Sequence, residues 1–451
     1  MKKRLSYIAL SVFLAGLIWG CIYLNSLLPI ITGYPAKYLC SAVFVSNRQP
    51  AEVESSELNF SLIRFASNQV NYREKSVTSR FLWGKSKAIY REGFGCTLLR
   101  DPEESMLKTK SFPQSQGISY SQNSTPWPLG NLMPEVPSGI DKQKLSAVSD
   151  RLITRDGYQG KAFAFVVVYK GCVVAEQYRH GFSANTRLLS WSMAKSFTNA
   201  LAGIMVLDGL LDIHKKDILP AWSDDRRKEI TVSDLMQMQS GLRWNEDYGN
   251  SSDVTLMLYR ERDYAGFAYN QLQEFPAGQH WYYSSGSTNI VNYVMRRQFR
   301  SDSAYQTFSK ERLFNKIGMP DAVFESDPSG TQVGSSYLYA TARDFARFGL
   351  LYLHDGVFNG ERILPEGWVK YSTTPASQSK GSYGAFFWLN QRKRYPQAPP
   401  DMYYCNGHDG QRIFIIPSKE LVVVILGYSP KPDHEMDFNR LLKDILAGLP
   451  G

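Results

Sequence analysis

Apolar residues occupy the start of the chain almost without interruption. Behind Met1-Lys2-Lys3-Arg4, an uncharged and mainly apolar run covers residues 5–31. A helix of about 20 apolar residues crosses a bilayer, so residues 1–31 are predicted to form a transmembrane anchor. A cleaved signal peptide is the alternative, but the run is long for one and no clear small-x-small site follows it.

The next segment is predicted to be extended over residues 32–100. Apolar and polar positions partly alternate at residues 58–65 and 88–90, and residues 97–99 form a further candidate strand. Residues 101–138 are rich in Pro, Ser, Gln and Asn, which is typical of a linker or of an arm lying on the main domain. Residues 32–124 are therefore assigned to an N-terminal extension and linker.

The strongest periodic patterns begin near residue 139. Helical spacing covers residues 141–155, and two apolar strands are predicted at residues 162–169 and 172–178. Lys170-Gly171 between them suits a hairpin turn, so these strands are expected to pair.

A mainly helical region follows, from about residue 190 to residue 315, before the strand pattern returns. Further strands are predicted at residues 384–389, 403–405, 412–416 and 421–426, with a closing helix at residues 436–446. This order describes an α/β sandwich, in which helices flank an antiparallel sheet and a separate helical subdomain is inserted. We place this domain at residues 125–451.

Composition supports an ordered, globular chain of 451 residues, with 43% hydrophobic and 21% charged residues. The net charge is +9, and residues 61–100 hold eight basic residues against two acidic ones. No aromatic-glycine motif for nucleic acids accompanies this cluster, so no nucleic-acid partner is expected. A solvated basic face, or one resting on an anionic membrane, fits better.

Five cysteines suit an exported chain. Cys40 and Cys96 both fall in the extension and are candidates for a disulfide, whereas Cys172 and Cys405 are expected to be isolated, buried thiols. Cys21 lies in the anchor, within a poor version of a lipoprotein cleavage box. No C-x-x-C pair or histidine cluster is present, so neither a metal nor another cofactor is expected.

Ser192 and Lys195 are the first candidates for chemistry. On a helix, their three-residue spacing puts both side chains on one face. A serine hydroxyl becomes a good nucleophile only when a nearby base takes its proton. Trp191, Met193 and Phe197 are apolar enough to desolvate the lysine amine, which is one way to lower the pKa of a lysine.

Tyr283 is the second candidate, because a Pro-Ala-Gly turn at residues 276–278 delivers an aromatic loop just before a predicted helix. A phenol acts as a base near pH 7 only if cations stabilise its ionised form, and Lys195 could supply that cation. The third candidate is the glycine-rich stretch at residues 405–411, which leads into a strand. Its backbone can approach a substrate closely, so an N–H there could bind an oxyanion together with that of Ser192.

These three stretches, in this order, resemble the serine-hydrolase family that includes class C β-lactamases, D-aminopeptidases and related esterases. S-x-x-K becomes Ser192-Met193-Ala194-Lys195, Y-x-N becomes Tyr283-Ser284-Ser285, and the third, strand-borne triplet becomes Cys405-Asn406-Gly407. The resemblance covers about residues 125–447. It implies a β-lactamase/transpeptidase-like fold, with Ser192, Lys195 and Tyr283 as catalytic residues.

The alignment also implies that the N–H groups of Ser192 and His408 form the oxyanion hole, with His408 contacting substrate. Shifting the third motif onto His408-Asp409-Gly410 would move this role to Gln411. Two departures matter: Ser285 replaces the usual asparagine and is expected to position the substrate, and Cys405 replaces the lysine that attracts a β-lactam carboxylate. Efficient lactamase or transpeptidase activity is therefore in doubt.

A closer resemblance is to the 6-aminohexanoate-dimer hydrolase branch. Trp127-Pro128-Leu129-Gly130, Trp244-Asn245-Glu246-Asp247-Tyr248 and residues 407–411 are similar to that branch. There the tyrosine of Glu-Asp-Tyr contacts the amide substrate, which implies a substrate-binding role for Tyr248.

Together these features predict a serine hydrolase that cleaves a small ester or amide through an acyl-enzyme on Ser192. The chain is expected to cross the cytoplasmic membrane once, because basic residues precede the anchor, with its catalytic domain on the periplasmic side. One alternative is a penicillin-recognising peptidase or β-lactamase that acts on cell-wall peptides or β-lactams. The other is a membrane-tethered binding module without catalysis.

Overall fold

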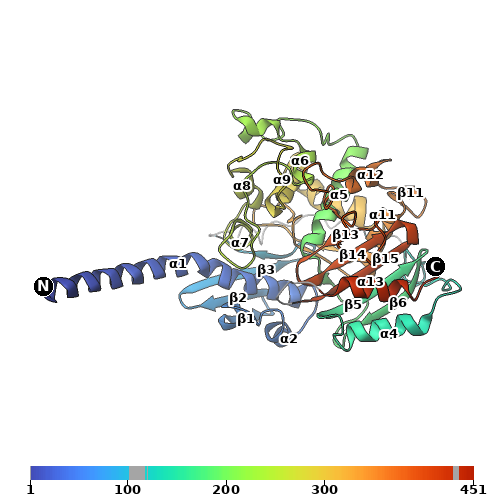
Figure 1. Ribbon diagram of the computed structural model, residues 1–451, viewed down its shortest axis with the longest axis horizontal. Coiled ribbons are helices and arrows are strands. Elements are labelled where there is room, and N and C mark those ends of the chain that lie inside the picture. Colours follow the sequence, from blue (N-terminus) through green and yellow to red (C-terminus); the bar gives the residue numbers. More distant parts are fainter. Residues whose placement is uncertain (1, 101–116, 119, 430–435, 451) are drawn as a thin grey trace. The chain divides into compact units, whose positions relative to one another are not determined.

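A computed structural model describes residues 2–100, 117–118, 120–429 and 436–450 (Figure 1). The described residues fall into two compact units, the first from Met1–Thr109 and Asn245–Arg262 and the second from Lys110–Trp244 and Asp263–Gly451. The segment Asn245–Arg262 thus groups with the first unit, although it lies inside the predicted hydrolase domain. Most of the predicted linker, residues 101–116, lies outside the described residues.

The first unit is built on one long helix, α1 (Lys2–Phe44). Large apolar side chains between Tyr7 and Tyr23 are exposed, whereas the helix surface from Leu28 onward is mostly buried. The stretch Leu10–Phe44 is long and apolar enough to cross a membrane or to serve as a signal sequence. Extended structure at residues 32–44 was therefore a wrong prediction, because this apolar segment stays helical and packs on a sheet.

That sheet is antiparallel, with strand order β1-β2-β3-β4. A disulfide joins Cys40 of α1 to Cys96 of β4. The strand predicted at residues 58–65 is wrong, since this stretch forms turns and a short 3-10 helix, and residues 88–90 and 97–98 are strand as predicted. The unit's other elements are α2 (Pro50–Ser55), the 3-10 turn η1 (Ile63–Phe65), β1 (Ser67–Asn71), β2 (Ser76–Phe81), β3 (Gly84–Arg91), β4 (Gly95–Leu98) and α7 (Asp253–Tyr259).

The second unit contains a six-stranded antiparallel sheet in the order β12-β13-β14-β15-β5-β6. The first and last segments of this unit therefore meet at its centre, where β15 pairs with β5. Its strands are β5 (Lys161–Tyr169), β6 (Cys172–Tyr178), β12 (Trp388–Leu389), β13 (Tyr403–Asn406), β14 (Arg412–Ile416) and β15 (Leu421–Tyr428).

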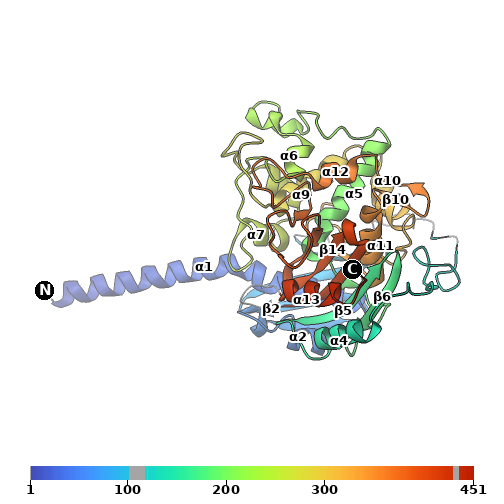
Figure 2. The ribbon, with the colours of Figure 1, turned by 45° about the vertical axis from the view of Figure 1, so that its right-hand side comes forward.

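Both faces of this sheet are covered by helices (Figures 1 and 2). Along β15, Leu421, Val423 and Ile425 belong to the hydrophobic core beneath α4 (Lys142–Ile153) and α13 (Phe438–Leu446). Val422 faces the other side, against Gly349 of α11 (Ala342–Leu353). Because alternate side chains of a strand point to opposite faces, burial on both sides explains the continuous apolar run.

The helical part of the second unit carries the predicted S-x-x-K and Tyr283 motifs. The same unit contains a short second sheet with the strand order β7-β9-β8. The elements here are β7 (Leu188–Leu189), the 3-10 turn η2 (Trp191–Met193), α5 (Ala194–Leu207), α6 (Val232–Met236), α8 (Tyr264–Tyr269), α9 (Ser285–Arg296), α10 (Asp302–Ser309), η5 (Lys310–Phe314), β8 (Val323–Phe324), β9 (Leu338–Ala340) and α12 (Trp368–Thr373).

Most predicted elements of this unit are confirmed, including the 170–171 hairpin turn and the closing helix. The strand predicted at residues 384–389 is reduced to Trp388–Leu389. The reason is that Phe386 has a positive φ and its N–H and carbonyl bond to Met236 and Ser196 of the helical part rather than to a neighbouring strand. Cys405 is buried as predicted, whereas Cys172 is only half-buried.

Candidate active site

Ser192 and Lys195 lie side by side where β7 ends and α5 begins. Ser192 sits in the 3-10 turn η2, and Lys195 is the second residue of α5. Trp191 has a φ of +47°, which is unusual for a bulky residue and turns the chain sharply between strand and helix. Lys195 Nζ donates to Ser192 Oγ over 3.0 Å. The serine is partly exposed, so a reactant could reach it, whereas the lysine is 1% exposed.

The Lys195 ammonium is held by three oxygen atoms. Besides Ser192, it donates to Ser285 Oγ and to the main-chain oxygen of Ser335, each over 3.0 Å. The amine is thereby aimed at the serine oxygen from a buried position.

A buried polar network fixes the Ser335 carbonyl. Asn289, on α9, donates to Ser335 Oγ over 3.2 Å and accepts from the Ser335 N–H over 3.4 Å. A Cβ on the neighbouring Gly334 would lie 1.8 Å from Asn292 Nδ2, so only glycine fits there. Thus α9 holds both Ser285 and the turn that carries Ser335 against Lys195.

Tyr283 approaches the same ammonium from the loop before α9. Lys195 Nζ lies 4.8 Å from the centre of the Tyr283 ring. The ring itself packs on Trp388, 5.5 Å between centres, and on Tyr383, 5.9 Å between centres. Next in the chain, Ser284 caps α9 by accepting from the Ser287 N–H, which anchors the loop. Tyr283 is half-buried and therefore still reachable from solvent.

The loop at residues 407–411 lies against the backbone that leads into Ser192. A Cβ on Gly407 would be 2.3 Å from the main-chain oxygen of Ser190, so this approach requires glycine. The His408 ring meets the Trp191 ring edge-on, with centres 5.5 Å apart. Asp409 has a φ of +58°, and His408 is partly exposed.

Gln411 ties this loop to the central strand β15. Its side-chain amide donates to the Gly427 oxygen over 2.6 Å and to the His408 oxygen over 3.1 Å, and it accepts from the Gly427 N–H over 2.9 Å. The buried Arg412 guanidinium also donates to the Gly407 oxygen, over 3.0 Å. The backbone of residues 407–411 is therefore preorganised, which is what an oxyanion site requires.

Two predicted residues have surroundings that bear on their roles. Ser285 is fully buried and accepts a hydrogen bond from Lys195. This position favours a role in holding the lysine over the predicted role in positioning the substrate. Burial raises the pKa of the Cys405 thiol to about 12, so this position carries no charge near pH 7.

Tyr248 belongs to the segment Asn245–Arg262 of the first unit, so its role toward Ser192 stays a prediction. Within that segment, Asp247 organises the turn around it by accepting from the Gly249 N–H over 2.8 Å.

The sequence pattern also missed Asn289 and Ser335. The only available signal for Ser335 was the run of small residues Gly334-Ser335-Ser336 before a short apolar strand.

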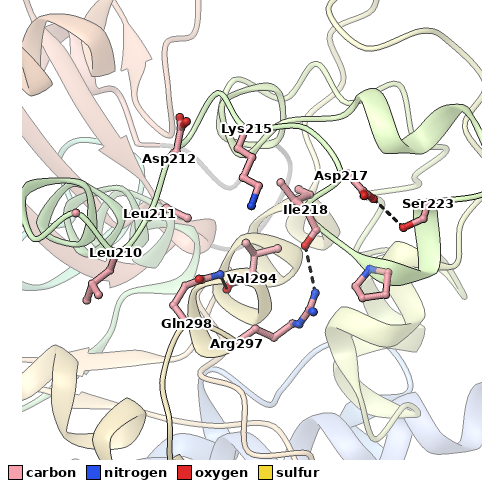
Figure 3. Close-up of a pocket in the computed structure, with 12 residues that line it drawn as sticks. Leu210, Leu211, Asp212, Lys215, Asp217, Ile218, Ser223, Val294, Arg297 and Gln298 are labelled. Atoms are coloured by element: carbon pink, nitrogen blue, oxygen red, sulfur yellow. Dashed lines mark hydrogen bonds between the residues drawn. The ribbon is translucent and has the colours of Figure 1, made fainter.

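A separate pocket of about 670 Å³ lies in the second unit (Figure 3). It lies beyond the C-terminal ends of α5 and α9, whereas the candidate catalytic residues lie at their N-terminal ends. Two hydrogen bonds join residues of its lining: Arg297 donates to the Ile218 oxygen, and Ser223 donates to Asp217. It contains none of the predicted site residues.

In the described part of the chain, no group of three or more His, Cys, Asp or Glu residues is arranged to hold a metal ion.

Comparisons with known proteins identify the family and the fold. A family model described as Beta-lactamase matches residues 150–447. The 6-aminohexanoate-dimer hydrolase of Paenarthrobacter ureafaciens is 26% identical over 298 residues, which cover 60% of this chain and 73% of that protein.

Solved structures share the fold. A Bacillus anthracis protein described as a 6-aminohexanoate-dimer hydrolase has a TM-score of 0.55 and 23% identity, over 66% of this chain and 82% of that one. A family VIII carboxylesterase has a TM-score of 0.53 and 16% identity, over 70% of this chain and all (100%) of that one.

Proposed function

We propose that this chain, which belongs to the beta-lactamase family, is a serine hydrolase. It cleaves an ester or amide bond through an acyl-enzyme on Ser192. The observation that carries this proposal is the contact of the buried Lys195 ammonium with Ser192 Oγ at 3.0 Å, next to the ring of Tyr283. An alcohol, an amine and a phenol in one cluster supply a nucleophile and a route for its proton.

In acylation, Ser192 Oγ attacks the substrate carbonyl while the Tyr283 oxygen, ionised with the help of the Lys195 charge, takes the serine proton. The N–H groups of Ser192 and His408 bind the tetrahedral oxyanion, and each donor contributes roughly 3 kcal/mol. Collapse of the intermediate breaks the carbonyl bond to the leaving alcohol or amine, which receives the proton from Tyr283. Water then attacks the acyl-enzyme and passes a proton to Tyr283. Tyr283 returns this proton to Ser192 Oγ as the bond between Oγ and the acyl carbon breaks, which releases the acid and restores Ser192 and the ionised Tyr283.

Linear amides come first among the substrates to test. The Paenarthrobacter ureafaciens relative is named for hydrolysis of the 6-aminohexanoate dimer, which is joined by a linear amide bond. The neutral Cys405 thiol offers no charge to the carboxylate of a β-lactam, which places β-lactams behind esters and linear amides in the order of testing. Tyr248 is proposed to contact the substrate amide.

We further propose that α1 anchors the chain in the cytoplasmic membrane, with the residues that follow its apolar N-terminal part on the outer, periplasmic side. The exposed apolar side chains between Tyr7 and Tyr23 suit a lipid environment, and Lys2-Lys3-Arg4 favours a cytoplasmic N-terminus. The Cys40–Cys96 disulfide supports an oxidising compartment outside the cytoplasm.

A hydrolysis panel on the purified full-length chain tests the activity. It comprises a short-chain p-nitrophenyl ester, the linear 6-aminohexanoate dimer, a D-Ala-D-Ala peptide and the β-lactam nitrocefin. Ser192-dependent turnover of the ester or the linear amide is expected. Preferential turnover of the peptide or the β-lactam would favour the penicillin-recognising alternative, and no turnover of any substrate would favour the binding module.

A further inference from the structure

The β2–β3 hairpin of the first unit runs alongside α1. A Cβ on Gly84 would lie 2.9 Å from Leu28 Cβ, and Ser86 Oγ lies 2.7 Å from Thr32 Oγ1. At the tip of the hairpin, the Trp83 indole N–H donates to Asn25 Oδ1 over 3.1 Å. The hairpin tip is therefore fixed beside α1 at residue 25, at the start of its buried part.

The tip exposes two large apolar side chains. Phe81 pairs with Gly84, so Leu82 and Trp83 form a two-residue turn. They are 62% and 59% exposed, respectively, and Leu82 has a φ of +51°. Such turns usually carry Asn, Asp or Gly, and large apolar residues gain nothing from water. An exposed Leu-Trp pair at this point indicates a surface meant for an apolar environment.

Positive charge flanks the same tip. Arg80 and Lys85 are directly opposite each other on neighbouring strands, and both are exposed. Among the residues that the structure describes, no carboxylate pairs with either of them. Like charges directly across an antiparallel pair repel each other, so an anionic group bound between them would offset this electrostatic repulsion.

The height of the tip along α1 matches a membrane surface. Residues 5–24 of a helix span about 30 Å at about 1.5 Å per residue, which is the thickness of the hydrocarbon core. Trp19 stacks on Tyr23 near the end of this exposed stretch, with ring centres 5.7 Å apart. Trp and Tyr prefer the interface between lipid and water, and Trp83 lies at that same level beside Asn25.

We propose that the β2–β3 tip is a membrane-docking site, in which Leu82 and Trp83 enter the outer interface of the bilayer while Arg80 and Lys85 bind the phosphates of anionic lipids. This proposal rests on the proposed membrane anchor. A transmembrane helix alone leaves the attached unit free to rotate and tilt, whereas a second contact beside it holds the unit in one orientation on the membrane.

Spin labels on single cysteines test this placement in the full-length chain. Leu82→Cys carries the label at the tip, and Val12→Cys marks the anchor. Tyr72→Cys is the matched control, because Tyr72 is 63% exposed and lies between β1 and β2, at the other end of β2 from the tip. Each variant is made in a background in which the unpaired native cysteines are replaced by serine: Cys21, Cys172 and Cys405.

The protein is reconstituted in vesicles of phosphatidylcholine, with or without one quarter phosphatidylglycerol, and label collisions with oxygen and with an aqueous nickel chelate are measured. The oxygen-to-nickel collision ratio at position 82 should exceed that at position 72 several-fold. Arg80→Gln with Lys85→Gln should lower the ratio at position 82 in vesicles that contain phosphatidylglycerol.

Two results would overturn the proposal in distinguishable ways. If position 12 is in lipid but position 82 is as accessible to nickel as position 72, the docking site is wrong and the anchor stands. If position 12 is also accessible to nickel, both fail. An unchanged ratio after the Arg80 and Lys85 substitutions would refute the anionic headgroup contact.

Discussion

The Lys195 ammonium donates to the main-chain oxygen of Ser335 over 3.0 Å, although the two residues are 140 positions apart in the chain. The same amine also donates to Ser285 Oγ and to Ser192 Oγ, each over 3.0 Å. A side-chain substitution cannot remove a main-chain oxygen. Because Asn289 holds the Ser335 turn in place, a substitution of Asn289 tests whether this turn positions the Lys195 amine.

Asn289→Ala should lower kcat up to about tenfold, because losing a hydrogen bond that positions the turn costs roughly 1 kcal/mol. KM should change little, since the Asn289 side chain is buried. The measurement is a steady-state pH profile, which should be displaced as the surroundings of Lys195 loosen. A fall in Tm with kcat and pH profile unchanged would mean that Asn289 is only structural.

Lys195→Met should reduce kcat/KM by about 10²–10⁴-fold, the usual contribution of a positioned acid or base. Methionine keeps the apolar part of the buried side chain but removes the charge and its three hydrogen bonds. Lys215→Met, at an exposed lysine of the same unit, is the control and should retain full activity. Equal activity of both variants would exclude Lys195 from the mechanism.

Tyr283→Phe removes the phenolic oxygen and keeps the ring that packs on Tyr383 and Trp388. We expect a loss of about 10²–10⁴-fold in kcat, with Tm unchanged within error. Tyr282→Phe is the matched control, because the neighbouring Tyr282 is exposed. If both variants retain wild-type kcat, proton transfer through Tyr283 is refuted.

Gly407→Ala should impair both stability and activity. The added Cβ would lie 2.3 Å from the Ser190 oxygen, and both partners are main chain, so the 407–411 loop must move away from Ser192. Overpacking of this kind costs about 1–3 kcal/mol in free energy of unfolding, and kcat should fall with it. Gly117→Ala, where a Cβ meets no atom of the described residues within 4 Å, is the control for stability. Full activity in Gly407→Ala would argue against an oxyanion site in this loop.

Asp327 should make stability depend on pH. Its pKa is raised from 3.8 to about 6, chiefly because the carboxyl is buried, although Ser329 and the Tyr264 N–H donate to it. A raised pKa of an acid means that the folded state binds the proton more tightly. The stabilisation of the folded state by the protonated Asp327 carboxyl is therefore complete below pH 3.8, and it is lost as pH rises through about 6.

Comparison with Asp327→Asn isolates this contribution. Over that pH window, the free energy of unfolding of the wild type should fall relative to the variant by about 3 kcal/mol, at 1.36 kcal/mol per pKa unit. Urea unfolding in detergent at several pH values measures the difference. Parallel pH curves for the two proteins would show that Asp327 does not carry the effect.

The fold was largely predictable because its sheet is buried on both faces. Runs such as residues 421–426 are apolar at every position, and the hairpin pair β5–β6 follows from chain order. The pairing of β15 with β5 does not, because these strands lie far apart in the chain. Local patterns misled where an environment distant in sequence decides the structure. Residues 32–44 remain helical because they pack on a sheet formed later in the chain, and Phe386 bonds to helices rather than to strands.

The site was predictable only as far as its motifs reach. Ser192, Lys195 and Tyr283 lie in recognisable patterns, and the structure brings them together. Ser335 contributes a main-chain oxygen, which any residue type could supply, so the sequence holds no specific signal for it. The grouping of the segment Asn245–Arg262 with the first unit was equally invisible, because it depends on contacts between segments far apart in the chain.

Covalent labelling of the full-length chain with a fluorophosphonate, mapped by mass spectrometry, tests the central claim most directly. The account predicts one adduct on the peptide that contains Ser192, and none on that peptide or elsewhere in Ser192→Ala. Labelling that persists unchanged in Ser192→Ala would contradict it and would remove this serine from the mechanism.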